Sequence, residues 1–149
     1  MGVNEIFKKA LEESQKGNLE EAEKLYREAL EISDLPEIWN NLGNVLRRMG
    51  RFGQAIEAYE SALRLDPDYK TAKLNLGLTL LDLERYSDSM LILENLKMSG
   101  YSPKELEYAL TVIYAKLGRY AQFLKLYREN RSEDLEKLLE THGVQPPKG

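Results

Sequence analysis

Apolar residues recur along this chain at steps of three and four residues, in runs that end at glycine or proline. One run contains Trp39, Leu42, Leu46 and Met49 and stops at Gly50. Such spacing places apolar side chains along one face of a helix, and glycine is common at a helix end. A second run follows the glycine and stops at Pro67: Phe52, Ala55, Ile56, Tyr59, Ala62 and Leu63. The pattern therefore predicts two helices joined by a tight turn.

This helix pair recurs along the chain with a constant period. Leu42 recurs as Leu76 and then as Leu110, and Gly43 recurs as Gly77. An upstream copy, one position out of register with the others, contains Gly17, Leu19, Ala22, Tyr26 and Ala29. A period of about 34 residues is typical of small stacked units that cannot bury their apolar faces alone. We predict four helix pairs, over residues 3–35, 36–69, 70–103 and 104–131.

The segment after the fourth pair has its own apolar spacing. It begins at Ser132, contains Leu135, Leu138 and Leu139, and ends at His142-Gly143. The last unit of a repeat array needs a helix with a polar back to cover its exposed end. We therefore predict a capping helix over residues 132–142 and a flexible tail over 144–149, with residues 1–143 forming a single domain.

Several residues mark helix ends and close contacts. Pro36 suits the first position of a helix, where its missing N–H is not needed. Asn18 with Glu21 resembles a capping box, and Ser102-Pro103 resembles an N-cap followed by a first-turn proline. Gly43 is expected where two helices approach closely, beside large core residues that include Tyr59. We interpret the recurring aromatic residues as core and not as a cofactor site.

The ordered string of the second pair resembles the tetratricopeptide repeat (TPR). Its members are Trp39, Leu42, Gly43, Leu46, Gly50, Phe52, Ala55, Tyr59, Ala62 and Pro67. The resemblance extends over nearly the whole chain, strongly in the second pair, well in the first and partially in the third and fourth. It implies an all-α, α-α superhelix fold, a right-handed solenoid of about four helix-turn-helix repeats plus the capping helix. It also implies that the first helices of the repeats line a concave groove in which an extended peptide lies.

Transferring the groove positions of that family to this chain identifies candidate peptide-binding residues. Asn41 and Asn75 are one full period apart, so equivalent helices should present them side by side. An asparagine amide can both donate to and accept from an extended backbone. The candidates are Asn40, Asn41, Asn44, Arg48, Leu74, Asn75, Leu78, Tyr108 and Val112.

Two alternatives stay open for these positions. The asparagines could be solvated residues on an exposed helix face, and Leu74 and Leu78 could be helix-contact core. Arg47, Arg48 and Arg51 are interpreted as a solvated face that pairs with acidic residues. A TPR subgroup that grips the carboxylate of chaperone tails is disfavoured, because Glu105 occupies a position that should be cationic.

Composition narrows the function classes further. The net charge is −4, which disfavours nonspecific attraction to nucleic acid. There is no cysteine and only one histidine, and the sequence contains no catalytic constellation, phosphate-binding glycine loop or metal-ligand cluster. No window approaches the roughly 18 consecutive apolar residues of a membrane helix. We expect no cofactor, no membrane insertion and a cytoplasmic location.

The sequence thus predicts a non-catalytic adaptor that binds an extended peptide of a partner protein. The alternative is a scaffold that self-associates through its C-terminal repeats into a homo-oligomer.

Overall fold

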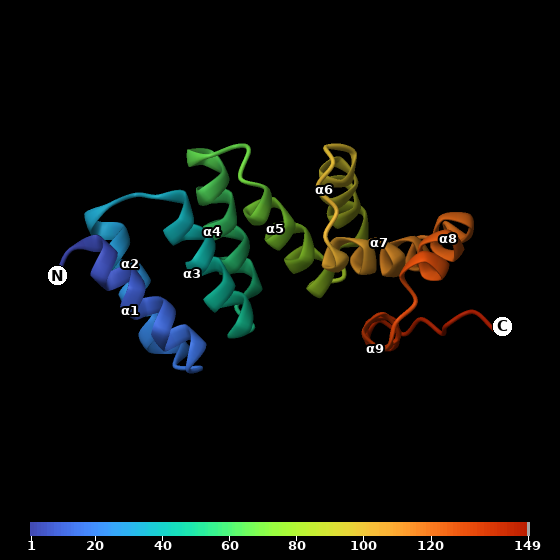
Figure 1. The fold of residues 1–149 in the computed structure, drawn as a ribbon, viewed down its shortest axis with the longest axis horizontal. Helices are drawn as coiled ribbons and strands as arrows, with labels where there is room; N and C mark the ends of the chain where they lie inside the picture. The colour runs from blue at the N-terminus through green and yellow to red at the C-terminus, as the bar shows by residue number, and fades with distance from the viewer. Residues whose placement is uncertain (149) are drawn as a thin grey trace. The chain divides into compact units, whose positions relative to one another are not determined.

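The computed structural model describes residues 1–148, which form nine α-helices and no strand (Figure 1). The helices are α1 (Val3–Gln15), α2 (Leu19–Ile32), α3 (Pro36–Arg48), α4 (Phe52–Leu65), α5 (Lys70–Asp82), α6 (Tyr86–Met98), α7 (Lys104–Lys116), α8 (Tyr120–Asn130) and α9 (Glu133–Thr141). The chain divides into two compact units, unit 1 (Met1–Thr79) and unit 2 (Leu80–Gly149). Helix α5 crosses the boundary. Gly149, the last residue of the predicted tail, lies outside the described residues.

The helix ends follow the sequence signals with two exceptions. Pro36 occupies the first turn of α3, as predicted, and Ser132 caps α9 by accepting a hydrogen bond from the backbone N–H of Leu135 at 3.1 Å. The predicted capping box at Asn18 is wrong, because its side chain donates to Glu13 instead. The N-cap of α7 is Pro103 and not Ser102, so that helix begins one residue later than predicted.

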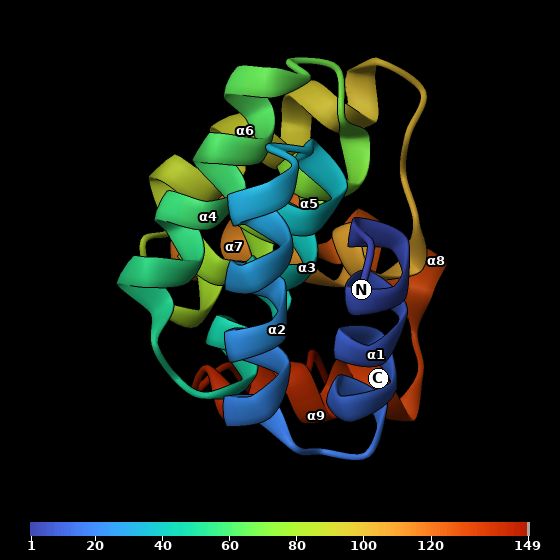
Figure 2. The ribbon, with the colours of Figure 1, turned by 90° about the vertical axis from the view of Figure 1, so that its left-hand side faces the viewer.

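Unit 1 is built around the contact between large aromatic residues and small ones. Helix α2 packs against both α1 and α3, and α3 packs against α4 (Figures 1 and 2). A Cβ added at Gly43 would lie 2.5 Å from Cε1 of Tyr59, so only glycine allows the observed approach of α3 to α4. The predicted close contact at Gly43 is confirmed. Tyr26 fills the neighbouring position between α1 and α2, where it meets Phe7 edge to face.

Unit 2 is organised around α7. Seven residues of this helix are buried, on more than one face: Leu106, Ala109, Leu110, Thr111, Val112, Ile113 and Tyr114. Helices α6, α8 and α9 all pack against α7, and Figure 1 shows α6 and α9 on opposite sides of it. A helix covered on several faces carries apolar residues around most of its circumference, and this explains the long apolar run of α7.

Candidate functional site

In unit 1, four of the exposed or half-exposed residues of α3 form a line along the helix. Glu37, Asn41, Asn44 and Arg48 follow one another at steps of four, three and four, and each is exposed or half-exposed. Residues at these steps share one face of a helix. Since Ile38, Leu42 and Leu46 of the same helix are buried, this line is a face of α3 that is open to solvent.

The neighbouring helices of unit 1 present the matching positions. On α5, one repeat further along the chain, they are Thr71, Asn75 and Leu78. On α1, one repeat earlier, they are Asn4, Lys8, Leu11 and Gln15. All of these side chains are also exposed or half-exposed. We call the combined set on α1, α3 and α5 the open stripe of unit 1.

One asparagine pair joins α5 to α3, with Asn75 on the stripe and Asn40 in the interior. Nδ2 of Asn75 donates to Oδ1 of Asn40 at 3.0 Å, and Asn40 also hydrogen-bonds the hydroxyl of Tyr69. Burial raises the pKa of Tyr69 and the nearby charge of Glu37 adds to this, while the bond to Asn40 acts in the opposite direction. Asn40 is only 3% exposed, so its prediction as a peptide contact is wrong. The residue positions Asn75 from within the fold.

Two further candidate residues are held in place by their own partners. Oδ1 of Asn44 accepts a hydrogen bond from the hydroxyl of the buried Tyr59 at 2.6 Å. Arg48 donates from Nη1 to both the carbonyl oxygen and Oγ of Ser14, at 2.9 and 3.0 Å. The first contact orients the Asn44 amide, and the second joins the C-terminal ends of α3 and α1.

The apolar candidates separate into two groups. Leu78 lies on the open stripe and is half-exposed. Leu74 is buried. It therefore belongs to the core between helices, which was the alternative to a place on the groove floor.

In unit 2 the two candidate residues are partly or completely buried. Val112 has 0% exposed surface, so the prediction that it offers a groove floor is wrong. The hydroxyl of Tyr108 is half-buried and accepts a hydrogen bond from Oγ of Ser132, the N-cap of α9, at 3.0 Å. The leucine spacing of residues 135–139 indicated that a helix follows α8. It did not indicate that this helix would contact Tyr108 on α7.

A hollow that sequence reasoning missed lies between α2, α3 and α4, with a volume of about 520 Å³. Trp39, Leu42, Leu46 and Ala58 form its apolar part, and Arg27, Arg51 and Arg64 its basic part. None of the candidate asparagines lines it. Acidic Glu57 and Glu60 also line the hollow, so its charge is mixed.

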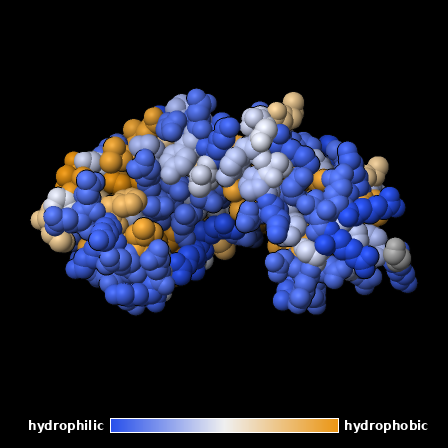
Figure 3. All heavy atoms as spheres, viewed as in Figure 1, coloured by the Kyte–Doolittle hydropathy of each residue, from blue (hydrophilic) through white to orange (hydrophobic). Residues whose placement is uncertain are grey.

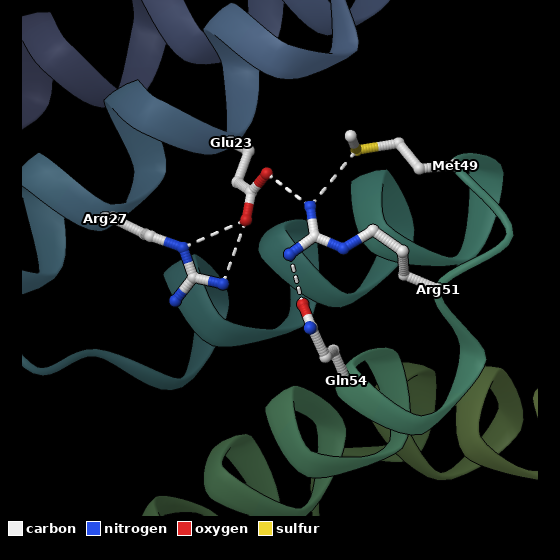
Figure 4. A network of polar contacts seen from close by, with 5 residues as sticks. All are labelled: Glu23, Arg27, Met49, Arg51 and Gln54. Atoms are coloured by element: carbon white, nitrogen blue, oxygen red, sulfur yellow. Dashed lines mark hydrogen bonds and ion pairs between the residues drawn. The ribbon is translucent and has the colours of Figure 1, made fainter.

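Two of these arginines share one acidic partner (Figure 4). Nη1 of Arg51 lies 2.6 Å from Oε1 of Glu23, and Nη2 of Arg27 lies 2.9 Å from Oε2. Arg51 also hydrogen-bonds Gln54. Burial raises the pKa of Glu23, but the hydrogen bonds from Arg51 and Arg27 outweigh it and leave the pKa below its ordinary value. Arg51 therefore pairs with an acidic residue, as predicted, whereas Arg48 of the same basic cluster hydrogen-bonds Ser14.

Metal binding and membrane crossing find no support in the part of the chain that the structure describes. Over residues 1–148, no three histidine, aspartate or glutamate side chains gather as a metal ion would require. No helix in that range combines the length and apolar character that a bilayer crossing needs.

Comparison with known families and structures supports the repeat. Residues 36–69 match the family described as tetratricopeptide repeat, and residues 10–50 match a second one described as TPR repeat. The Sgt2 TPR domain of Aspergillus fumigatus is 22% identical, with a TM-score of 0.71 over 80% of this chain and 82% of that one.

Two bacterial proteins have the same fold over more of the chain. MamA (41-end) from Desulfovibrio magneticus is 17% identical, with a TM-score of 0.82 over 95% of this chain and 83% of that one. PilF from Pseudomonas aeruginosa is 17% identical, with a TM-score of 0.76 over 95% of this chain and 73% of that one.

These matches confirm the predicted fold class, an all-α helical repeat. Repeats of this kind serve in general as protein–protein interaction modules. The family matches cover residues 10–69, from within α1 to the loop after α4, and the fold match extends along the chain, so this protein contains tetratricopeptide repeats.

Proposed function

We propose that this protein is a non-catalytic adaptor that holds an extended segment of a partner protein along the open stripe of unit 1. The observation that supports the proposal is the recurrence of exposed residues at matching positions on α1, α3 and α5. Hydrogen bonds from two residues of the stripe link the three helices, from Arg48 on α3 to Ser14 on α1 and from Asn75 on α5 to Asn40 on α3. The stripe is thus a continuous surface with fixed spacing.

The chemistry of the stripe suits an extended backbone. Asn41, Asn44 and Asn75 carry amides, which offer both donors and acceptors to the N–H and C=O groups of a bound segment. Each such bond is worth about 1 kcal/mol net, so the amides set the register more than the affinity. Leu11 and Leu78 supply apolar surface for side chains of the ligand, and a few polar groups beside apolar surface are usual at binding sites.

The experiment compares one stripe variant with a matched control. Partner segments captured by the wild-type chain are sequenced, synthesised as peptides and titrated calorimetrically against each variant. Asn41→Ala should weaken binding by about fivefold with an unchanged melting temperature, since the loss of about 1 kcal/mol corresponds to that factor. Asn95→Ala, an exposed asparagine on α6 outside the stripe, should bind as the wild type does. Equal affinities of all three proteins for every captured peptide would rule out the stripe as the binding surface.

Self-association through unit 2 is the second candidate function. Most of the surface drawn in Figure 3 is hydrophilic, yet unit 2 exposes the large apolar side chains of Leu91 and Met98 on α6 and Tyr120 on α8. Exposed apolar side chains of this size are often covered in an assembly. Sedimentation at several concentrations tests this candidate, and a monomer at all of them would exclude it.

A further inference from the structure

The face of α7 that corresponds to the open stripe is covered. Its middle positions, one repeat after Asn75 and Leu78, are Ala109 and Val112. Asn75 and Leu78 are half-exposed, whereas Ala109 and Val112 have no exposed surface. Helix α9 packs against α7, on the side opposite α6 (Figure 1). The C-terminal helix of the chain therefore lies where the other first helices are open.

Polar contacts hold α9 at both of its ends. At the N-terminal end, Oγ of Ser132 donates to the hydroxyl of Tyr108 at 3.0 Å. At the C-terminal end, Nδ1 of His142 and the hydroxyl of Tyr86 are hydrogen-bonded at 2.9 Å, and the two rings meet edge to face. A third contact, from the hydroxyl of Tyr127 to Oε1 of Glu136 at 3.0 Å, attaches the middle of α9 to α8.

The apolar contribution of α9 is small. Leu135 and Leu139 are completely buried, and Leu138 is half-buried. Helix α9 has nine residues, fewer than any other helix among residues 1–148. Helices this short are not stable by themselves in water, so α9 persists only while it is docked. Short elements with few buried contacts open at the low end of the stability range of a protein.

From these observations we infer that the face of α7 beneath α9 is a second binding surface, which accepts an amphipathic helix of a partner protein, with α9 as its resident occupant. The bound helix resembles α9: leucines at positions i, i+3 and i+4 face α7, and a serine or other hydroxyl residue at its N-cap reaches Tyr108. The small side chains of Ala109 and Val112 allow the helix to approach closely. The surface belongs to unit 2 alone, so the inference does not rest on peptide binding by the open stripe.

The test loosens α9 without removing its leucines. The double variant Ser132→Ala/His142→Ala of the full chain lacks the contacts to Tyr108 and Tyr86. The probe is a fluorescein-labelled peptide of residues 131–144, and the control is the same peptide with Leu135→Asp and Leu139→Asp. Binding is measured by fluorescence anisotropy, and amide hydrogen exchange of residues 135–141 reports how often α9 opens.

The double variant should bind the probe about tenfold more tightly than the wild type, since a larger open fraction lowers the apparent Kd in proportion. Its α9 amides should exchange faster, and the control peptide should bind neither protein. Equal probe affinity for variant and wild type, unchanged exchange in α9, or equal binding of the control peptide would each overturn the inference. Dimerisation of the variant that Leu135→Asp abolishes would assign the surface to α9 of a second copy, which also overturns it.

Discussion

Asn75 donates a hydrogen bond from Nδ2 to Oδ1 of Asn40 at 3.0 Å, although the repeat period aligns Asn75 with Asn41. The two neighbours on α3 therefore have different roles. Asn40 is 3% exposed and belongs to the packing between helices, whereas Asn41 is half-exposed and lies on the open stripe. Substitutions at these two positions should therefore separate stability from the proposed binding in unit 1.

Asn75→Ala should destabilise the fold by about 1 kcal/mol, because Asn40 would lose a partner in a buried setting. Asn41→Ala should leave the free energy of unfolding unchanged, since no buried group depends on Asn41 in the same way. Urea denaturation followed by circular dichroism measures both. Equal destabilisation by the two substitutions would contradict the assignment of Asn40 to the interior.

Gly43→Ala should destabilise unit 1 by roughly 1–3 kcal/mol, because the added methyl group would overlap the ring of Tyr59 and force the helices apart. The distance to Cε1 would be 2.5 Å. Gly53 is the matched control, since it also lies in a helix but a Cβ there meets nothing within 4 Å.

Gly53→Ala should therefore stabilise the protein by about 0.5–1 kcal/mol through the higher helix propensity of alanine. Thermal unfolding of both variants gives the comparison. Equal tolerance of alanine at Gly43 and Gly53 would contradict the close approach of α3 to α4 at Gly43.

Leu42→Ala should destabilise the protein by about 2–5 kcal/mol, since it opens a cavity in the core of unit 1. Leu42 is 1% exposed, whereas Leu91 is 67% exposed. Leu91→Ala should therefore change stability by less than about 0.5 kcal/mol. Chemical denaturation distinguishes the two, and a near-neutral Leu42→Ala would exclude its interior position.

Glu23 should make the stability of the protein decline in acid. Because its pKa in the folded state is below the ordinary value of 4.5, the carboxylate stabilises the fold above that value. This stabilisation is lost as the pH falls through and below 4.5, because the Glu23 carboxylate becomes protonated and no longer carries the charge that attracts Arg51 and Arg27. Melting temperatures between about pH 6 and pH 3 should fall less steeply for Glu23→Gln than for the wild type. Glu20→Gln, an exposed position on the same helix, should keep the wild-type slope.

Protonation of His142 should weaken the docking of α9, at a higher pH than the protonation of Glu23. Burial lowers its pKa below the ordinary 6.5, Glu84 and Asp82 act in the opposite direction, and Lys116 adds to the lowering. The folded state thus binds the proton less well than the unfolded state. Stability is complete above about pH 6.5 and declines as the pH falls below it.

Thermal unfolding at about pH 7.5 and about pH 5.5 measures this change above the range in which Glu23 titrates. The wild type should be less stable at the lower pH, and His142→Gln should remove most of the difference. A wild type equally stable at both values would show that His142 does not contribute to holding α9.

Much of the secondary structure could be predicted because its signals are local. The period of the apolar residues indicates where each helix lies, and Pro36 and Ser132 mark helix starts through the hydrogen bonds of a single turn. Asn18 and Ser102 were misjudged because capping depends on the side-chain rotamer and on competing partners, such as Glu13 for Asn18. The residue pattern alone does not show which of the competing partners a side chain will bind.

The candidate site was only partly predictable. Asn41, Asn44, Arg48, Asn75 and Leu78 lie on exposed or half-exposed positions of unit 1. Asn40, Leu74 and Val112 were placed on the binding surface but are buried. Neighbouring positions on a helix are about 100° apart, so the orientation of the packed helix about its axis decides which of Asn40 and Asn41 faces inward.

The sequence by itself determined the helix pairs, their regular period, the glycine at the α3–α4 contact and a final short helix with a leucine face. These follow from which side chains can share one helix face and how little space a glycine occupies. Only the tertiary structure decided that α9 packs against α7, where Ala109 and Val112 are buried, and that Asn40 and not Asn41 holds Asn75. A leucine face can dock on any apolar surface of suitable shape, so its partner is selected by the packing of the surrounding helices and not by its own residues.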